Sequence, residues 1–254
     1  MIRLALVLFL LTQSAARAGE EVIADTSQNL VSITANFDGS SILIFGAVKR
    51  DAPPPETGPL QVVIAVTGPL SPVVVRRKER MFGIWVNKDF VNVDLAPSFY
   101  AVASTGPLRD VLSDLDDLRH KISIKRMIRS VGAPMDVDEP GKFPEAIVRI
   151  RRASGLYSEI GGLVGLKDET LFRTEIRLPS NLVEGDYRTR IFLTREKKII
   201  DEFETRIAVR KVGLERWIYN LAHQRPLVYG LLSLAIAIIA GWLASAVFRL
   251  LRLN

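Results

Sequence analysis

The order of apolar and polar residues predicts a mostly β chain. Short apolar runs rich in Val and Ile recur across residues 22–105 and return at 171–209, and Gly, Pro, Asn and Asp separate them. This spacing is typical of a β-sandwich or barrel. Between Leu171 and Leu178 apolar and charged residues alternate, which predicts a strand with one solvated face. We therefore expect a mainly β fold with a few helices.

Two local patterns refine this prediction. Pro179 followed by Gly185-x-Tyr187 is similar to the late half of an immunoglobulin-like β-sandwich, in which a tyrosine bonds back to the preceding corner. The segment Asn36–Gly39, between the first two apolar runs, predicts a hairpin turn, because Asp-Gly adopts positive φ at low cost. The first pattern is an analogy of fold and implies no function.

Helical spacing interrupts the β pattern. From Pro107 onward apolar residues recur every three to four positions, acidic residues come early and basic residues late, and Gly132 and Pro134 follow. We expect one helix here and a shorter helix from Pro144 to about Ala153. Together they form a helical insertion.

Both ends of the chain have the composition of membrane-targeting segments. A short basic start, the apolar run Leu4–Leu11 and the A-x-A sequence ending at Ala18 predict a cleaved signal peptide. Pro226–Phe248 carries no charge, and at about 1.5 Å per residue it reaches roughly 34 Å, enough for one membrane span. We expect a bacterial inner-membrane, single-pass protein with its body in the periplasm and its C-terminus in the cytoplasm.

These patterns divide the chain into seven parts. We expect a signal peptide at 1–18, a β-rich segment at 19–105, the helical insertion at 106–155, a second β-rich segment at 156–211, a juxtamembrane amphipathic segment at 212–225, a transmembrane helix at 226–248 and a cytoplasmic tail at 249–254.

Composition narrows the function classes. The chain contains no cysteine, so disulfides, thiol catalysis and thiolate metal ligands are excluded. A formal net charge of +6 suits a membrane surface or an acidic partner, and for an exported body it does not indicate nucleic acid. The two histidines, His120 and His223, lie far apart, and no hydrolase, metalloprotease or phosphate-loop motif is present. We expect no metal, no cofactor and no catalytic residue.

The strongest cluster of charge is a row of basic residues. If its segment is extended, Arg76, Lys78 and Arg80 share one face at about 7 Å spacing, which suits an anionic headgroup, a small anion or an acidic partner. The alternative is an edge strand that charge protects against aggregation. Both interpretations stay open.

The transmembrane helix carries a second candidate. Ser233, Ala237, Gly241 and Ser245 repeat every four residues, a stripe that lets another helix approach closely. The alternative is the ordinary frequency of small residues in spanning helices. Before this helix, Val212–Ala222 has an apolar face and either lies along the interface or extends the span, with a bend at Pro226.

Four segments resemble one protein family. Val73–Asn87, Phe99–Leu108, Leu171–Pro179 and Lys211–Ser233 are similar, in this order, to the alphaproteobacterial "putative transmembrane protein (Alph_Pro_TM)" family. The resemblance implies an inner-membrane protein with a periplasmic domain, and it suggests a sulfite-exporter-type permease as partner. It carries over no activity and no functional residue.

Three hypotheses follow. The first is a non-enzymatic, membrane-anchored periplasmic protein that helps a multispanning transporter to assemble or work. The second is a periplasmic module that binds or senses small anions through Arg76, Lys78 and Arg80. The third is an envelope enzyme that uses carboxylates, for which no particular pair of acids stands out.

Overall fold

The computed structural model describes residues 19–34, 36–51, 53, 57–129, 137 and 139–252. The predicted signal peptide at 1–18 lies outside these residues. The chain forms two compact units, one from the segments up to Val31 and from Asp38 to Val209, the other from Ser32 to Phe37 and from Arg210 onward.

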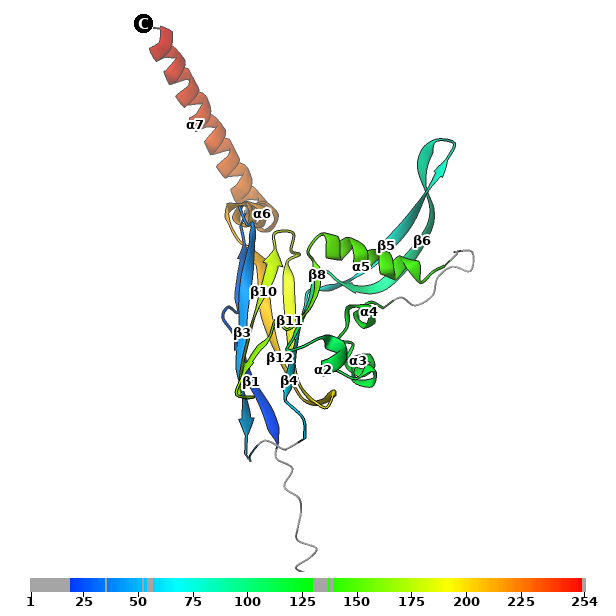
Figure 1. Ribbon diagram of the computed structural model, residues 1–254. Helices are drawn as coiled ribbons and strands as arrows, with labels where there is room; N and C mark the ends of the chain where they lie inside the picture. The colour runs from blue at the N-terminus through cyan, green and yellow to red at the C-terminus, as the bar shows by residue number, and fades with distance from the viewer. Residues whose placement is uncertain are drawn as a thin grey trace, which may run out of the picture. The chain divides into compact units, whose positions relative to one another are not determined.

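The first unit is built on a β-sandwich (Figure 1). One sheet has the order β1-β3-β10-β9, and the other has the order β2-β12-β11-β4-β7-β8, in which β7 and β8 run parallel. Strands from both β-rich segments of the sequence contribute to each sheet. The bounds are β1 (Glu20–Thr26), β2 (Leu30–Ile33), β3 (Gly39–Arg50), β4 (Gln61–Thr67), β7 (Tyr100–Ser104), β8 (Tyr157–Gly161), β9 (Gly165–Lys167), β10 (Leu171–Pro179), β11 (Gly185–Arg195) and β12 (Lys198–Lys211).

This strand order is that of an immunoglobulin-like sandwich. The four-stranded sheet corresponds to strands A, B, E and D, and the core of the larger sheet corresponds to G, F, C and C′. Burial along β10 alternates as its sequence predicts, with Phe172 and Leu178 inside and Arg173 outside. The predicted fold class is confirmed.

The tyrosine corner is present. The Tyr187 hydroxyl donates to the Val183 carbonyl oxygen at 2.8 Å, and the Tyr187 ring lies 5.9 Å from the Phe99 ring. Burial raises the pKa of Tyr187 because the phenolate would lose its hydration. Thr189, fully buried two residues later, stands where antibody domains carry the second cysteine of their disulfide.

The turn predicted at Asn36–Gly39 is wrong. The strand before it, β2, belongs to the six-stranded sheet, whereas β3 belongs to the four-stranded sheet, so this segment crosses between the sheets. Gly39 does adopt positive φ, at 122°, and a Cβ there would lie 2.9 Å from the Leu178 carbonyl oxygen. The glycine fits a close approach to β10 instead of a hairpin.

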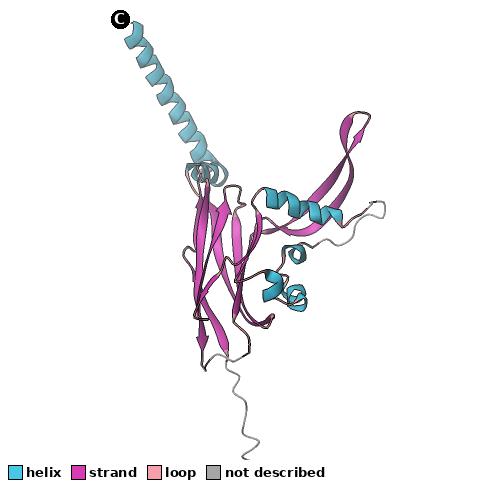
Figure 2. Cartoon of the chain, in the orientation of Figure 1, coloured by secondary structure: helices cyan, strands magenta, loops and turns pink. Residues whose placement is uncertain are grey.

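The helical insertion packs on the outer face of the six-stranded sheet (Figure 2). A second apolar core forms there, in which Val63 and Phe192 from the sheet meet Ile122 and Ile147 from the insertion. The central strands β4 and β11 are therefore covered on both sides, which explains their nearly continuous apolar sequences.

The single helix expected after Pro107 is wrong. The segment forms α2 (Leu108–Val111), α3 (Asp114–His120) and α4 (Ile124–Met127). The Asp117 carboxylate accepts from the backbone N–H groups of Ile122 and Ser123, and Lys121 adopts a left-handed φ of 52°. These side-chain bonds end the helix early, because they replace helical backbone bonds. The second helix, α5 (Lys142–Ala153), agrees with its prediction.

The second unit contains two helices, α6 (Leu214–Gln224) and α7 (Pro226–Arg252). Arg225 has a non-helical φ of −138°, so the chain breaks before Pro226 as the proline predicts. Within the described residues, Pro226–Val247 is the one helical segment long and apolar enough to cross a membrane, and none of it is buried.

Replacing Tyr187 tests the corner. We expect Tyr187→Phe to lower the free energy of unfolding by about 1–2 kcal/mol, because the bond to Val183 is lost. The same exchange at the exposed Tyr219 should change it by less than about 0.5 kcal/mol. Denaturant unfolding of the full chain in detergent, followed by circular dichroism, measures both.

The cost of Tyr187→Phe should also depend on pH. Because the folded pKa of Tyr187 is raised, its contribution is complete below pH about 10 and declines as the pH rises towards the folded value. The difference between wild type and variant should therefore narrow in alkaline solution. Equal losses in the Tyr187 and Tyr219 variants would contradict the role of the corner.

Candidate functional site

The most prominent feature of the first unit is a long β-ribbon formed by β5 (Leu70–Met81) and β6 (Ile84–Pro97) (Figure 1). It continues the pairing of β4 and β7 without a change of register, from Val63↔Ser104 to Ser71↔Ala96. At the junction the Gly68 N–H donates to the Phe99 carbonyl oxygen at 2.8 Å. A Cβ on Gly68 would lie 2.7 Å from the Ser98 hydroxyl, so this junction leaves no room for a larger residue.

One face of the ribbon is held by α5. Arg77 on β5 forms an ion pair with Asp89 on β6, and its guanidinium lies 5.7 Å from the centre of the Phe143 ring on α5. Val73 and Val75 pack against the second apolar core. The ribbon is therefore fixed to the body by side chains at alternate positions of β5.

The opposite face carries the predicted basic row. Arg76, Lys78 and Arg80 are exposed at alternating positions of β5. Across the ladder Arg76 opposes Phe90, and Arg80 opposes Trp85. Opposed residues project from the same side of a ribbon. We call these five residues the basic–aromatic face.

The sequence interpretation missed the two aromatic residues of this face. They become neighbours of the basic row only when the hairpin register is known. The signal that could have found them is Gly83, which marks a two-residue turn and thereby fixes which residues oppose each other.

The ribbon ends in an exposed apolar tip. Met81, Phe82, Ile84 and Trp85 are 46, 102, 64 and 68% exposed. Phe82 and Gly83 form the turn with φ of 49° and 85°, so both central residues have positive φ, as in a type I′ turn. Phenylalanine is uncommon in this conformation, which Asn, Asp and Gly favour.

A groove of about 610 Å³ lies between β5 and α5. Its lining is strongly basic and contains a single acid. The lining residues are Val75, Arg76, Arg77, Lys78, Lys142, Phe143, Glu145, Ala146 and Arg149. The groove is open enough to reach the edge of the ribbon, because its lining also includes Arg76 and Lys78 of the predicted row, although the row projects mainly from the other face; Arg80 is not part of the lining.

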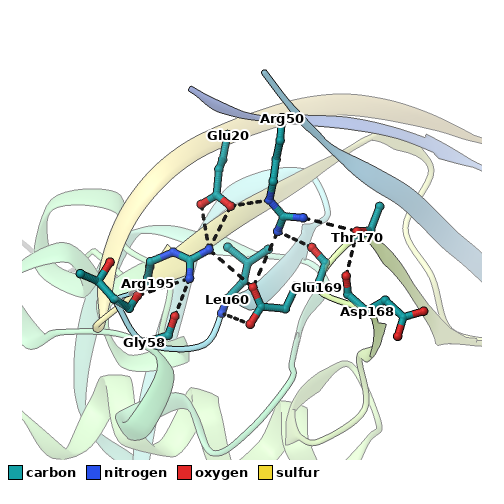
Figure 3. Close-up of polar contacts among 9 residues, drawn as sticks. Glu20, Arg50, Gly58, Leu60, Asp168, Glu169, Thr170 and Arg195 are labelled. Carbon is teal, nitrogen blue, oxygen red and sulfur yellow. Dashed lines mark hydrogen bonds and ion pairs between the residues drawn. The ribbon is translucent and has the colours of Figure 1, made fainter. Parts of the chain in front are cut away.

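A buried cluster of acidic and basic side chains lies at another part of the sandwich (Figure 3). Glu20, 5% exposed, accepts from Arg195 at 2.9 and 3.1 Å and from Arg50 at 2.6 Å. At the edge of the cluster, the Glu169 side chain is 38% exposed and lies 3.7 Å from Arg195 and 3.9 Å from Arg50. The cluster joins β1, β3, β11 and the turn before β10. Two acids balance two bases, which is typical of a structural role.

The small-residue stripe lies on α7 with its side chains exposed. The Ser233 hydroxyl donates to the Tyr229 carbonyl oxygen at 2.9 Å. Apart from the backbone of α7 itself, no group among the described residues lies within 4 Å of a Cβ built on Gly241. The stripe therefore leaves a shallow strip along the helix. Its four members are Ser233, Ala237, Gly241 and Ser245.

The histidines do not come together. The His120 Nδ1 atom lies 3.1 Å from a Glu202 carboxylate oxygen, and the His223 Nδ1 atom lies 2.9 Å from the Tyr219 carbonyl oxygen. In the part of the chain that the structure describes, no group of three or more His, Asp or Glu residues is arranged to hold a metal ion.

Arg195 should be necessary for stability. We expect Arg195→Met to destabilise the body by about 3 kcal/mol, because it leaves the buried Glu20 carboxylate poorly compensated. Lys49→Met, which removes the exposed pair with Glu21, should cost less than about 1 kcal/mol. Thermal and denaturant unfolding compare the two variants. Similar losses would contradict a structural role for the cluster.

Comparison with known proteins identifies the family of this chain. No curated protein matches this chain. The family model described as "Putative transmembrane protein (Alph_Pro_TM)" matches residues 21–250, which include the sandwich, the ribbon and the candidate span. This confirms the resemblance found in the sequence. The chain therefore belongs to the Alph_Pro_TM family of transmembrane proteins.

Proposed function

We propose that this protein is a non-enzymatic accessory subunit of a multispanning membrane transporter. In this proposal α7 spans the bacterial inner membrane once, and the immunoglobulin-like body works in the periplasm. The observation that carries the proposal is the combination of one exposed candidate span with a body of a fold that commonly serves in recognition.

The predicted signal peptide supports this orientation. Cleavage after Ala18 would leave Gly19 as the first residue, and the first described strand begins at Glu20. The mature chain would then begin one residue before Glu20, so it would keep the carboxylate that pairs with Arg50 and Arg195 in the buried cluster.

The partner would contact α7 through the small-residue stripe. Helix association in lipid depends on close packing, and small side chains let two backbones approach. At Gly241 the surface of α7 is open, so a second helix would meet no side chain there. A sulfite-exporter-type permease is our preferred partner class, on the basis of the family resemblance.

Enlarging the stripe tests this role. We expect Gly241→Leu and Ala237→Leu each to reduce recovery of a co-purifying multispanning protein about five-fold, since such contacts contribute about 1 kcal/mol. The measurement is crosslinking in native membranes, followed by affinity purification of the full chain in mild detergent. Ile238→Leu and Ile239→Leu, off the stripe, are the matched controls. Absence of any such partner, or equal recovery for all variants, would refute the proposal.

A second candidate function is the binding of small anions. The observation that favours it is the groove between β5 and α5, whose basic residues outnumber its one acid, Glu145. An anion such as sulfite, sulfate or phosphate could accept hydrogen bonds from several of these side chains at once. This function would reside in the body and would not require the stripe.

Ligand-dependent stability tests the groove. At ten times its Kd, an anion should stabilise the full chain by about 1.4 kcal/mol, seen as a higher Tm at constant ionic strength. We expect Lys142→Gln combined with Arg149→Gln to abolish the shift. Lys125→Gln combined with Arg126→Gln removes the same charge from the exposed surface of α4 and should preserve it. An unchanged Tm in sulfite, sulfate, phosphate and acetate would exclude this function.

A further inference from the structure

We propose that the tip of the β5–β6 ribbon inserts into the interface of an anionic lipid bilayer. This gives the protein a second membrane contact besides α7. The contact involves lipid only, so it does not depend on the accessory role or on any protein partner.

The tip has the surface that such insertion requires. Four large apolar side chains follow one another around the turn, and Phe82 at its apex is wholly exposed. No described part of the chain covers them. Contiguous apolar surface at the end of a projecting element is typical of an interaction site and not of a solvated loop.

The conformation of the turn indicates that Phe82 serves something other than folding. The φ of 49° at this position favours Asn, Asp or Gly, and an L-residue with a bulky side chain is strained there. Burial of the Phe82 ring does not compensate for this strain, because the ring is fully exposed. Its apolar surface is therefore available to a contact outside the chain.

The order of residues along the ribbon matches the layers of a bilayer interface. Phe82 and Ile84 form the apex, Trp85 comes next beside Arg80, and Lys78 and Arg76 follow. Apolar residues reach the acyl chains, tryptophan prefers the headgroup level, and basic side chains pair with anionic headgroups.

The charge of the ribbon favours anionic lipid. The two acids nearest the tip are engaged by neighbours, because Glu79 pairs with Lys88 at 2.7 Å and Asp89 pairs with Arg77. The third acid of the ribbon, Asp94, lies near its base, away from the tip. The row Arg76, Lys78 and Arg80 supplies the exposed charge of the other face towards the tip. Near an anionic leaflet each such residue raises partitioning about five-fold.

A second copy of the chain fits the ribbon less well. Strand addition needs a regular free edge, and the ladder of this ribbon shifts register between Ser71 and Val73 and again between Arg77 and Lys78. Such bulges interrupt edge pairing. Pro72 also lacks the N–H that an added strand would need.

Tryptophan quenching tests the proposal directly. The full chain carries three tryptophans, so Trp217→Phe and Trp242→Phe leave Trp85 as the only emitter. The protein is reconstituted in vesicles of phosphatidylcholine and phosphatidylglycerol with bromine on the upper acyl chain. We expect roughly two-fold quenching of Trp85, because interfacial side chains lie about 5–10 Å into this region.

A matched control places the reporter elsewhere on the body. In the chain that also carries Trp85→Phe, Glu175→Trp puts a tryptophan on the solvated face of β10. This tryptophan should stay unquenched. If Trp85 is unquenched, or if both positions are quenched equally, the proposal is wrong.

Two variants separate the contributions of the tip. Phe82→Asn creates Asn-Gly, the preferred type I′ turn, so we expect equal or higher thermal stability together with weaker quenching of Trp85. Replacing Arg76, Lys78 and Arg80 by Gln should abolish the difference between vesicles with and without phosphatidylglycerol. Undiminished quenching in Phe82→Asn, or insensitivity of the wild type to phosphatidylglycerol, would overturn the proposal.

Discussion

The backbone ladder between β4 and β7 determines where the basic–aromatic face and the apolar tip of this protein lie. It passes Gly68 without a change of register and becomes the ribbon of β5 and β6. The ribbon is therefore an extension of two central strands that are packed on both faces, and not a separate loop. Its basic–aromatic face and its tip therefore lie on strands that are continuous with the core. This differs from immunoglobulin-like domains, which often carry their binding residues on loops at the ends of the sandwich.

Local rules predicted the parts of the fold whose environment repeats along the chain. The strand β10 could be predicted from its alternating apolar and charged residues, because one of its faces packs on the core and the other contacts water. The role of Tyr187 in the corner could be predicted because its hydroxyl bonds to a residue only four positions earlier, Val183. The helix after Pro107 was mispredicted, because one carboxylate, that of Asp117, bonds two backbone N–H groups beyond the helix end. The Asn36–Gly39 turn failed for a related reason, since positive φ serves a sheet crossover as well as a hairpin.

The candidate sites also fall into two groups, those that local sequence patterns predict and those that depend on contacts between distant segments. The row of Arg76, Lys78 and Arg80 depends only on a period of two, and the sequence supplied it. The groove requires β5 to lie beside α5, and the buried cluster requires Glu20 to meet Arg195 across 175 positions of the chain. No local sequence pattern predicts contacts between residues so far apart in the chain. They follow from the order of the strands in the sheets, which the local sequence patterns did not predict.

Thr189 occupies the position at which antibody domains of similar architecture carry a disulfide cysteine, and the whole chain contains no cysteine. Packing, the corner bond and the buried ion cluster therefore carry the stability of the body without covalent help. Its maturation needs no electron acceptor and no disulfide isomerase. Reductants that unfold antibody domains would leave this one intact, so the same body is suited to compartments of any redox potential.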